Sequence, residues 1–205
     1  INASPNFESK AYYSFSVVAT DAAGNASEEV VALLINNLDE IAPTFTSGAT
    51  ASVNENVAAG TLVYTATSTD SGDISTGSTT YSLSGADADA FSIDASTGAV
   101  TINASPNYEG QNSYSFSVVA TDAASNASFK AVTLSVSDVN EFSVTIPTDS
   151  SATANTVAEN SANGTIVGLT AYASDADGTT NAVSYSLVGD AAGTTSYSAG
   201  EFAIG

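Results

Sequence analysis

Residues 113–122 read SYSFSVVATD, and this stretch decides the fold. Apolar side chains alternate along it with small polar ones, and the apolar side chains that share one face are Tyr114, Phe116, Val118 and Ala120. A period of two is typical of a β-strand that buries one face. The stretch therefore predicts a strand that ends at an aspartate.

The chain repeats itself with a period of about 100 residues, which indicates an array of globular modules. Residues 1–27 read INASPNFESKAYYSFSVVATDAAGNAS, and a near copy, INASPNYEGQNSYSFSVVATDAASNAS, begins at Ile102. Residues 53–61 read VNENVAAGT, and VAENSANGT begins at Val157. We expect three parts: the C-terminal part of one repeat (1–42), a complete repeat (43–142) and the N-terminal part of a further repeat (143–205).

The complete repeat reads as short strands separated by turns. Further candidate strands are residues 61–67, 80–83, 91–93, 99–103 and 131–138. Turn chemistry separates them, with Gly60, Gly85 and Gly98 among the turn residues. About seven short strands in about 100 residues, without a helical period, predict an all-β, immunoglobulin-like sandwich.

The charge balance excludes nucleic acid as a partner. The chain has 22 acidic and two basic residues, for a formal net charge of −20, whereas binding to phosphates requires a basic surface. Such an excess opposes compaction by self-repulsion, so we expect a cation to compensate it. We expect no membrane insertion in this segment, because no apolar run approaches the ~20 residues that a spanning helix needs.

Missing residue types narrow the chemistry further. Without histidine there is no imidazole base or ligand, and without cysteine there is no thiol nucleophile or zinc–cysteine motif. Only oxygen ligands remain, and these favour Ca²⁺ or Mg²⁺ over transition metals.

Four acidic motifs follow the strand pattern. Glu55 lies in NEN, Glu109 follows Asn107 and Tyr108, Asp122 ends the strand quoted above, and residues 138–141 read DVNE. Each motif has a second copy, at Glu159, Glu8, Asp21 and residues 37–40 respectively.

These motifs, together with residues 91–102 (FSIDASTGAVTI) and 38–45 (LDEIAPTF), resemble the calcium-binding motifs of cadherin repeats, in the form found in giant bacterial surface adhesins. The resemblance covers the whole chain. It implies tandem, seven-stranded Greek-key β-sandwiches in a linear array, with Ca²⁺ bound at each junction between neighbouring repeats.

Carried over residue by residue, the resemblance implies two sets of ligands. The first junction would use Glu8, Asp39, Glu40, Asp70, Asp73 and Asp122, and the second Glu55, Asn107, Glu109, Asp138, Asn140, Glu141, Asp175 and Asp177. Each junction would gather six carboxylates, which repel strongly without cations. We therefore expect a flexible array without Ca²⁺ and a stiff one with it.

Some positions depart from the family pattern. Asn107 replaces an aspartate, Glu141 and Glu40 replace the shorter linker aspartate, and Asn37 replaces the first linker acid. Residues 70–73, DSGD, are not the family's paired DxD. These departures predict fewer or more weakly bound ions at the first junction.

The resemblance favours a structural spacer in cell adhesion, at the extracellular cell surface. The alternative is a calcium-dependent module that binds polysaccharide or adheres homophilically. We expect no enzyme, because the carboxylates repeat at both junctions as structural ligands do. Aromatic side chains within the strand alternation are read as core and not as a sugar platform.

The two terminal parts together would make up almost one repeat. Either the limits of the chain have nothing to do with its assembly, or the C-terminal part of one molecule is completed by the N-terminal part of the next. The second interpretation predicts head-to-tail self-association through unpaired strand edges.

Overall fold

The computed structural model describes residues 1–74, 77–179, 181–189 and 202–203, and these residues form short strands with a single 3-10 turn. The chain forms two compact units. One contains residues 1–51, 58–104 and 114–134, and the other contains residues 52–57, 105–113 and 135–205. No helix in the described part of the chain has the length and apolar character needed to cross a membrane.

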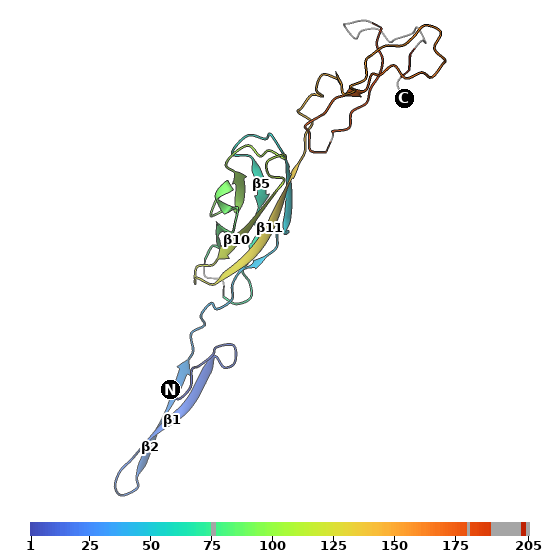
Figure 1. The fold of residues 1–205 in the computed structure, drawn as a ribbon. Coiled ribbons are helices and arrows are strands. Elements are labelled where there is room, and N and C mark those ends of the chain that lie inside the picture. The colour runs from blue at the N-terminus through green and yellow to red at the C-terminus, as the bar shows by residue number, and fades with distance from the viewer. Residues whose placement is uncertain (75–76, 180, 190–201, 204–205) are drawn as a thin grey trace. The chain divides into compact units, whose positions relative to one another are not determined.

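Seven strands of the complete repeat form two sheets (Figure 1). One sheet has the order β4-β11-β10-β7. Its strands are β4 (Thr50–Asn54), β7 (Thr80–Ser84), β10 (Ser113–Thr121) and β11 (Ala127–Ser137). The other has the order β5-β9-β8, from β5 (Leu62–Thr65), β8 (Phe91–Ile93) and β9 (Ala99–Ile102). A two-residue pair, β3 (Thr44–Phe45) with β6 (Ser68–Thr69), and a 3-10 turn, η1 (Ala88–Ala90), complete the repeat.

Aromatic side chains join the two sheets. Phe116 on β10 lies with its ring centroid 4.7 Å from that of Phe91 on β8 and 6.2 Å from that of Tyr64 on β5. On β9, β10 and β11 the buried side chains come from alternate positions and include Val100, Ile102, Val118, Ala120, Val132 and Leu134, whereas Val63 and Tyr64 are neighbours on β5 and both buried. The predicted β-sandwich and the period of two in residues 113–122 are therefore confirmed.

One glycine is required by a close approach of the backbone. Gly98 has φ +70, and a Cβ there would lie 2.3 Å from the carbonyl oxygen of Ala66. The amide of Ala66 also donates to the carbonyl of Gly98 at 2.9 Å. Only glycine fits such a contact without displacing backbone, so the predicted turn at Gly98 brings two segments of the sandwich together.

The terminal parts contain fewer strands. Residues 1–42 form a two-stranded antiparallel ribbon, β1 (Tyr12–Thr20) with β2 (Ala26–Leu34), in which Tyr13 pairs with Leu33 and Phe15 with Val31. The described residues after 142 contain one short pair, β12 (Thr148–Asp149) with β13 (Ala171–Tyr172). The division into three repeats at 42/43 and 142/143 stays a prediction.

Candidate metal centres

Three acidic side chains from the linker and two loops form the first group, the Asp39 group. Carboxylate oxygens of Asp39, Asp70 and Asp122 all lie within 4.8 Å of one another. Asp122 is buried and the other two are half-buried. Desolvation raises the pKa of Asp70, and the nearby charges of Asp39 and Asp122 raise it further. The group is therefore electrostatically unfavourable by itself.

The turn after β10 holds Asp122 in place. The amide of Asn126 donates to Asp122 Oδ1 at 2.8 Å, and Asn126 Nδ2 donates to Oδ2 at 2.9 Å. Ser125 has φ +76, and the equivalent residue of the first copy is Gly24, with φ +88. Asn126 Nδ2 also donates to the carbonyl of Asp39 at 3.0 Å, so this side chain connects the turn to the linker.

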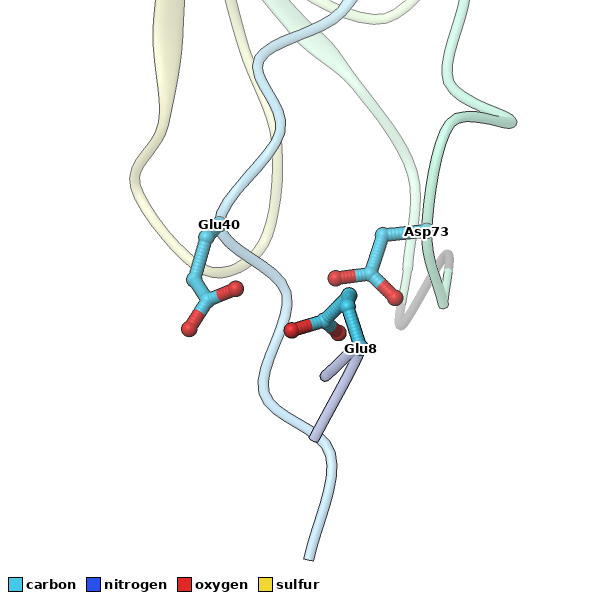
Figure 2. Close-up of side chains that lie close together, drawn as sticks. All are labelled: Glu8, Glu40 and Asp73. Carbon is cyan, nitrogen blue, oxygen red and sulfur yellow. The ribbon is translucent and has the colours of Figure 1, made fainter. Parts of the chain in front are cut away.

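The second group, the Glu8 group, lies on more exposed chain. Figure 2 shows the carboxylates of Glu8, Glu40 and Asp73 close together, and their oxygens lie within 4.8 Å of one another. Glu8 and Glu40 are exposed and Asp73 is half-buried. Asn37 Nδ2 donates to Asp73 Oδ1 at 2.7 Å, which ties the start of the linker to the Asp73 loop.

The spacing between Asp70 and Asp73 separates them into different groups. Asp70 lies with Asp39 and Asp122, whereas Asp73 lies with Glu8 and Glu40. All six acids predicted for the first junction are thus brought into two groups of three. The DSGD sequence, which departs from the family pattern, supplies one acid to each group.

The third group, the Glu55 group, contains Glu55, Glu109 and Asp138, again with oxygens within 4.8 Å of one another. Glu55 is 2% exposed. Its carboxylate accepts hydrogen bonds from the amides of Tyr108 and Val139, both at 2.7 Å. These two bonds fix one buried carboxylate between the loop after β9 and the end of β11.

Glu141 and Asp177 adjoin the Glu55 group. A hydrogen bond with the Asn56 side chain lowers the pKa of Glu141, but desolvation and the charges of Glu55, Glu109 and Asp177 outweigh it, so the pKa is raised overall. Asp177 is 2% exposed, and its Oδ1 accepts the amide of Glu141 at 3.1 Å. The raised pKa of Glu141 reflects the several negative charges that lie close to it.

Besides Glu141 and Asp177, three more residues of the predicted second set are not members of the Glu55 group. Asn107 Oδ1 accepts the amide of Gly110 at 2.6 Å and so closes its own turn. Asp175 Oδ1 accepts the amide of Asp177 at 3.3 Å within the 175–179 loop. Asn140 is exposed, at the linker. Their role as ligands stays a prediction.

The donor set fits a hard cation. Ca²⁺ binds oxygens at 2.3–2.6 Å, so two ligands of one ion lie at most about 5 Å apart, and the oxygens within each group meet this limit. Among the residues that the structure describes, five buried side-chain oxygens have no hydrogen-bond partner: Asn37 Oδ1, Asp39 Oδ2, Asp70 Oδ2, Asp138 Oδ1 and Asp177 Oδ2. A buried polar atom without a partner is costly, and all five belong to these groups or adjoin them.

Sequence reasoning missed three contributors. Asn37 replaces the first linker acid of the family pattern, yet its side-chain amide donates to Asp73 and its side-chain oxygen is buried without a partner. Asn126 was not singled out, although its spacing from Asp122 recurs as Asp21 and Asn25 with the same side-chain bond at 2.8 Å. Thr179 donates to Asp138 Oδ2 through its amide at 2.6 Å and through its hydroxyl. Only the Asp–Asn spacing left a signal in the sequence.

Comparisons with known proteins agree with this fold. The family model of the cadherin domain matches residues 49–137. The chain is similar to mouse cadherin-23 EC22-24, with a TM-score of 0.62 and 26% identity over 93% of this chain and 62% of that chain. It also resembles protocadherin gamma B2 extracellular cadherin domains 3-6 in fold, with a TM-score of 0.60 and 22% identity over 84% of this chain and 44% of that one.

A third solved structure, the protocadherin gammaB7 EC3-6 cis-dimer, has a TM-score of 0.59 and 21% identity over 84% of this chain and 45% of that one. This chain spans less than two thirds of the length of each of the three. Residues 49–137 thus match the cadherin domain, and the chain is cadherin-like.

The opposite pKa shifts of Asp70 and Asp94 predict opposite effects of neutralising them. The pKa of Asp70 is raised above 3.8 in the folded state. Its contribution to the free energy of unfolding is therefore fully present below pH 3.8 and is lost as the pH rises through the folded-state pKa. Hydrogen bonds from the Thr97 amide and the Ser96 side chain lower the pKa of Asp94 to about 2, so its contribution is present above 3.8 and is lost as pH falls toward 2.

In chelator at pH 7 we therefore expect Asp70→Asn to raise the urea midpoint of the complete repeat and Asp94→Asn to lower it. Urea titrations at several pH values, followed by circular dichroism, check both changes, and the two variants carry the same change of charge. A lower midpoint for Asp70→Asn in chelator at pH 7 would contradict this reading of the Asp39 group.

Proposed function

We propose that this chain is a calcium-rigidified segment of a long extracellular surface adhesin or filament of the bacterial type, and that it acts as a structural spacer at the cell surface. The observation that carries the proposal is the position of the buried oxygens without partners. They occur on linker residues (Asn37, Asp39 and Asp138) and on loop residues (Asp70 and Asp177).

Bound Ca²⁺ would supply the missing positive charge and link the linker to the loops. In the Asp39 group, the linker residue is Asp39 and the loops contribute Asp70 and Asp122. In the Glu8 group, the linker residue is Glu40. An ion in the Glu8 group would restrict the linker, because Glu8 precedes the linker and Asp73 follows it. An ion in the Asp39 group would tie the linker to two loops of the complete repeat.

The cadherin domain at residues 49–137 supports an extracellular adhesion-type module. The three repeats proposed at 1–42, 43–142 and 143–205 would follow one another in series, and such a series makes a long spacer. The comparisons give no support to the polysaccharide-binding alternative. Because the similar protocadherin gammaB7 structure is a cis-dimer, homophilic contact is the second candidate.

Calcium should stabilise the chain and make it more extended. One ion at a hundred times its Kd contributes about 2.7 kcal/mol, and each kcal/mol shifts the Tm of a domain of this size by about 4–8 °C. We therefore expect a rise of roughly 10 °C or more in Tm in millimolar Ca²⁺, together with a larger radius of gyration in small-angle X-ray scattering.

Matched variants separate ion binding from charge screening. Asp39→Asn and Asp138→Asn should lose part of both changes, whereas Asp89→Asn, an exposed acid outside the groups, should keep them. NaCl at the same ionic strength should not reproduce the effect. Equal responses to Ca²⁺ and NaCl, or no response, would contradict the spacer proposal.

We also propose head-to-tail self-association through the β1–β2 ribbon, with residues 143–205 of a second copy as the occupant. Leu33 is 41% exposed, whereas the equivalent Leu134 of the complete repeat is fully buried against the second sheet. Leu34 is 73% exposed, and its equivalent, Ser135, is exposed as well. By this equivalence, a second copy would cover the face of the ribbon that carries Leu33, and the face that carries Leu34 would stay outside.

We expect the mass from light scattering to rise with protein concentration, because an unclosed head-to-tail contact adds molecules in series. Leu33→Ser should weaken the association and the neighbouring Leu34→Ser should leave it intact. A monomer mass at every concentration, or an equal effect of the two substitutions, would rule the contact out.

A further inference from the structure

A glycine of the 175–179 loop lies against an aromatic ring next to the Glu55 group. A Cβ on Gly178 would lie 2.6 Å from Cε1 and 2.7 Å from Cδ1 of Tyr108. The backbone of Gly178 is not left-handed, so its conformation alone does not call for glycine. The steric contact does, because a Cβ closer than 3.0 Å to two ring atoms would force either the ring or the loop to shift.

At this close approach, two backbone amides of the loop donate hydrogen bonds to carboxylates of the Glu55 group. The amide of Gly178 donates to Glu109 Oε1 at 3.2 Å, and the amide of Thr179 donates to Asp138 Oδ2 at 2.6 Å. The loop thereby satisfies one oxygen on each of two carboxylates and leaves Asp138 Oδ1 without a partner. Its position decides which oxygens face a cation.

The same loop carries Asp177, whose Oδ2 is buried without a partner. Only one residue separates this carboxylate from the Thr179 amide, so a displacement of Gly178 moves Asp177 as well. If the loop were lifted by the extra methyl group of an alanine, the Gly178 and Thr179 amides would withdraw from Glu109 and Asp138 together.

The first linker shows a related contact. A Cβ on Gly72 would lie 2.9 Å from Cγ2 and 3.2 Å from Cδ1 of Ile41, and the backbone of Gly72 is likewise not left-handed. Gly72 lies between Asp70 and Asp73, the two acids that enter different groups. In both places a loop that carries acids approaches an apolar side chain through a glycine.

We propose that Gly178 is a positioning residue: its contact with Tyr108 seats the 175–179 loop on the Glu55 group without any ion, and so holds Asp177 ready for a cation. The position of the loop depends only on the steric contact with Tyr108 and on the two hydrogen bonds that the Gly178 and Thr179 amides donate. The effect of this position on cation binding rests on the proposed function. Tyr108 is thus part of the seat and not a ligand.

Nuclear magnetic resonance tests the seat in the absence of calcium. In ¹⁵N-glycine-labelled chain in chelator, the amide and Hα resonances of Gly178 should be shifted by the ring current of Tyr108. Tyr108→Leu should remove that shift. Gly48 has open space around its Cβ position and a backbone that is not left-handed, so Gly48→Ala should leave the Gly178 resonances unchanged.

Calorimetric titration then tests the consequence for the ion. Gly178→Ala should weaken Ca²⁺ binding by at least about tenfold, as is typical when a group that orients metal ligands is lost, whereas Gly48→Ala should bind like the parent chain. Tyr108→Ala placed in the Gly178→Ala background should recover affinity, because it removes the clash and the two substitutions share one contact.

The outcomes separate the seat from the calcium proposal. If the Gly178 resonances in chelator show no shift that depends on Tyr108, the proposed positioning of the 175–179 loop is wrong, whether or not the chain binds Ca²⁺. Equal Ca²⁺ affinities of Gly178→Ala and Gly48→Ala overturn its positioning role. A ring-shifted Gly178 in a chain that binds no Ca²⁺ supports the seat and contradicts the proposed function.

Discussion

The main constraint on this structure is a set of buried carboxylate oxygens that accept no hydrogen bond from the protein. With two basic residues in the whole chain, ion pairs cannot neutralise 22 acids. Asp39 Oδ2, Asp70 Oδ2 and Asp138 Oδ1 are buried without partners, although each is costly to leave so. The fold therefore keeps an electrostatic penalty at its linkers, and a divalent cation is the simplest group that would relieve it.

The sandwich makes this penalty tolerable because it is stabilised elsewhere. Phe116, Phe91 and Tyr64 join the two sheets, and burial of such rings is the main favourable term in a domain of this size. The acids lie at strand ends and in turns, where Asn126 fixes Asp122 and the Tyr108 and Val139 amides fix Glu55. A rigid scaffold thus holds like charges closer than they would stay in a flexible chain.

The strands could be read from the sequence because each buries one face. Alternation predicted strands at residues 113–122 and 131–138, and these correspond to β10 and to the second half of β11. The two-residue β3 and β6 are too short to show a period. The acidic motifs contain the nine acids of the three groups, but they did not show how Asp70 and Asp73 divide between two groups, which arises in three dimensions. Asn107, Asn140 and Asp175, predicted from the same motifs, are not in these groups. The Thr179–Asp138 bond joins residues 41 apart and left no local signal.

The most direct test is to locate the ions. Crystals grown in CaCl₂ and measured at a wavelength that enhances calcium's anomalous signal should show ions coordinated by the Asp39 group and by the Glu55 group, with Asp39 Oδ2, Asp70 Oδ2 and Asp138 Oδ1 among the ligands. Peaks absent from both groups, with these three oxygens still lacking any partner, would contradict the account.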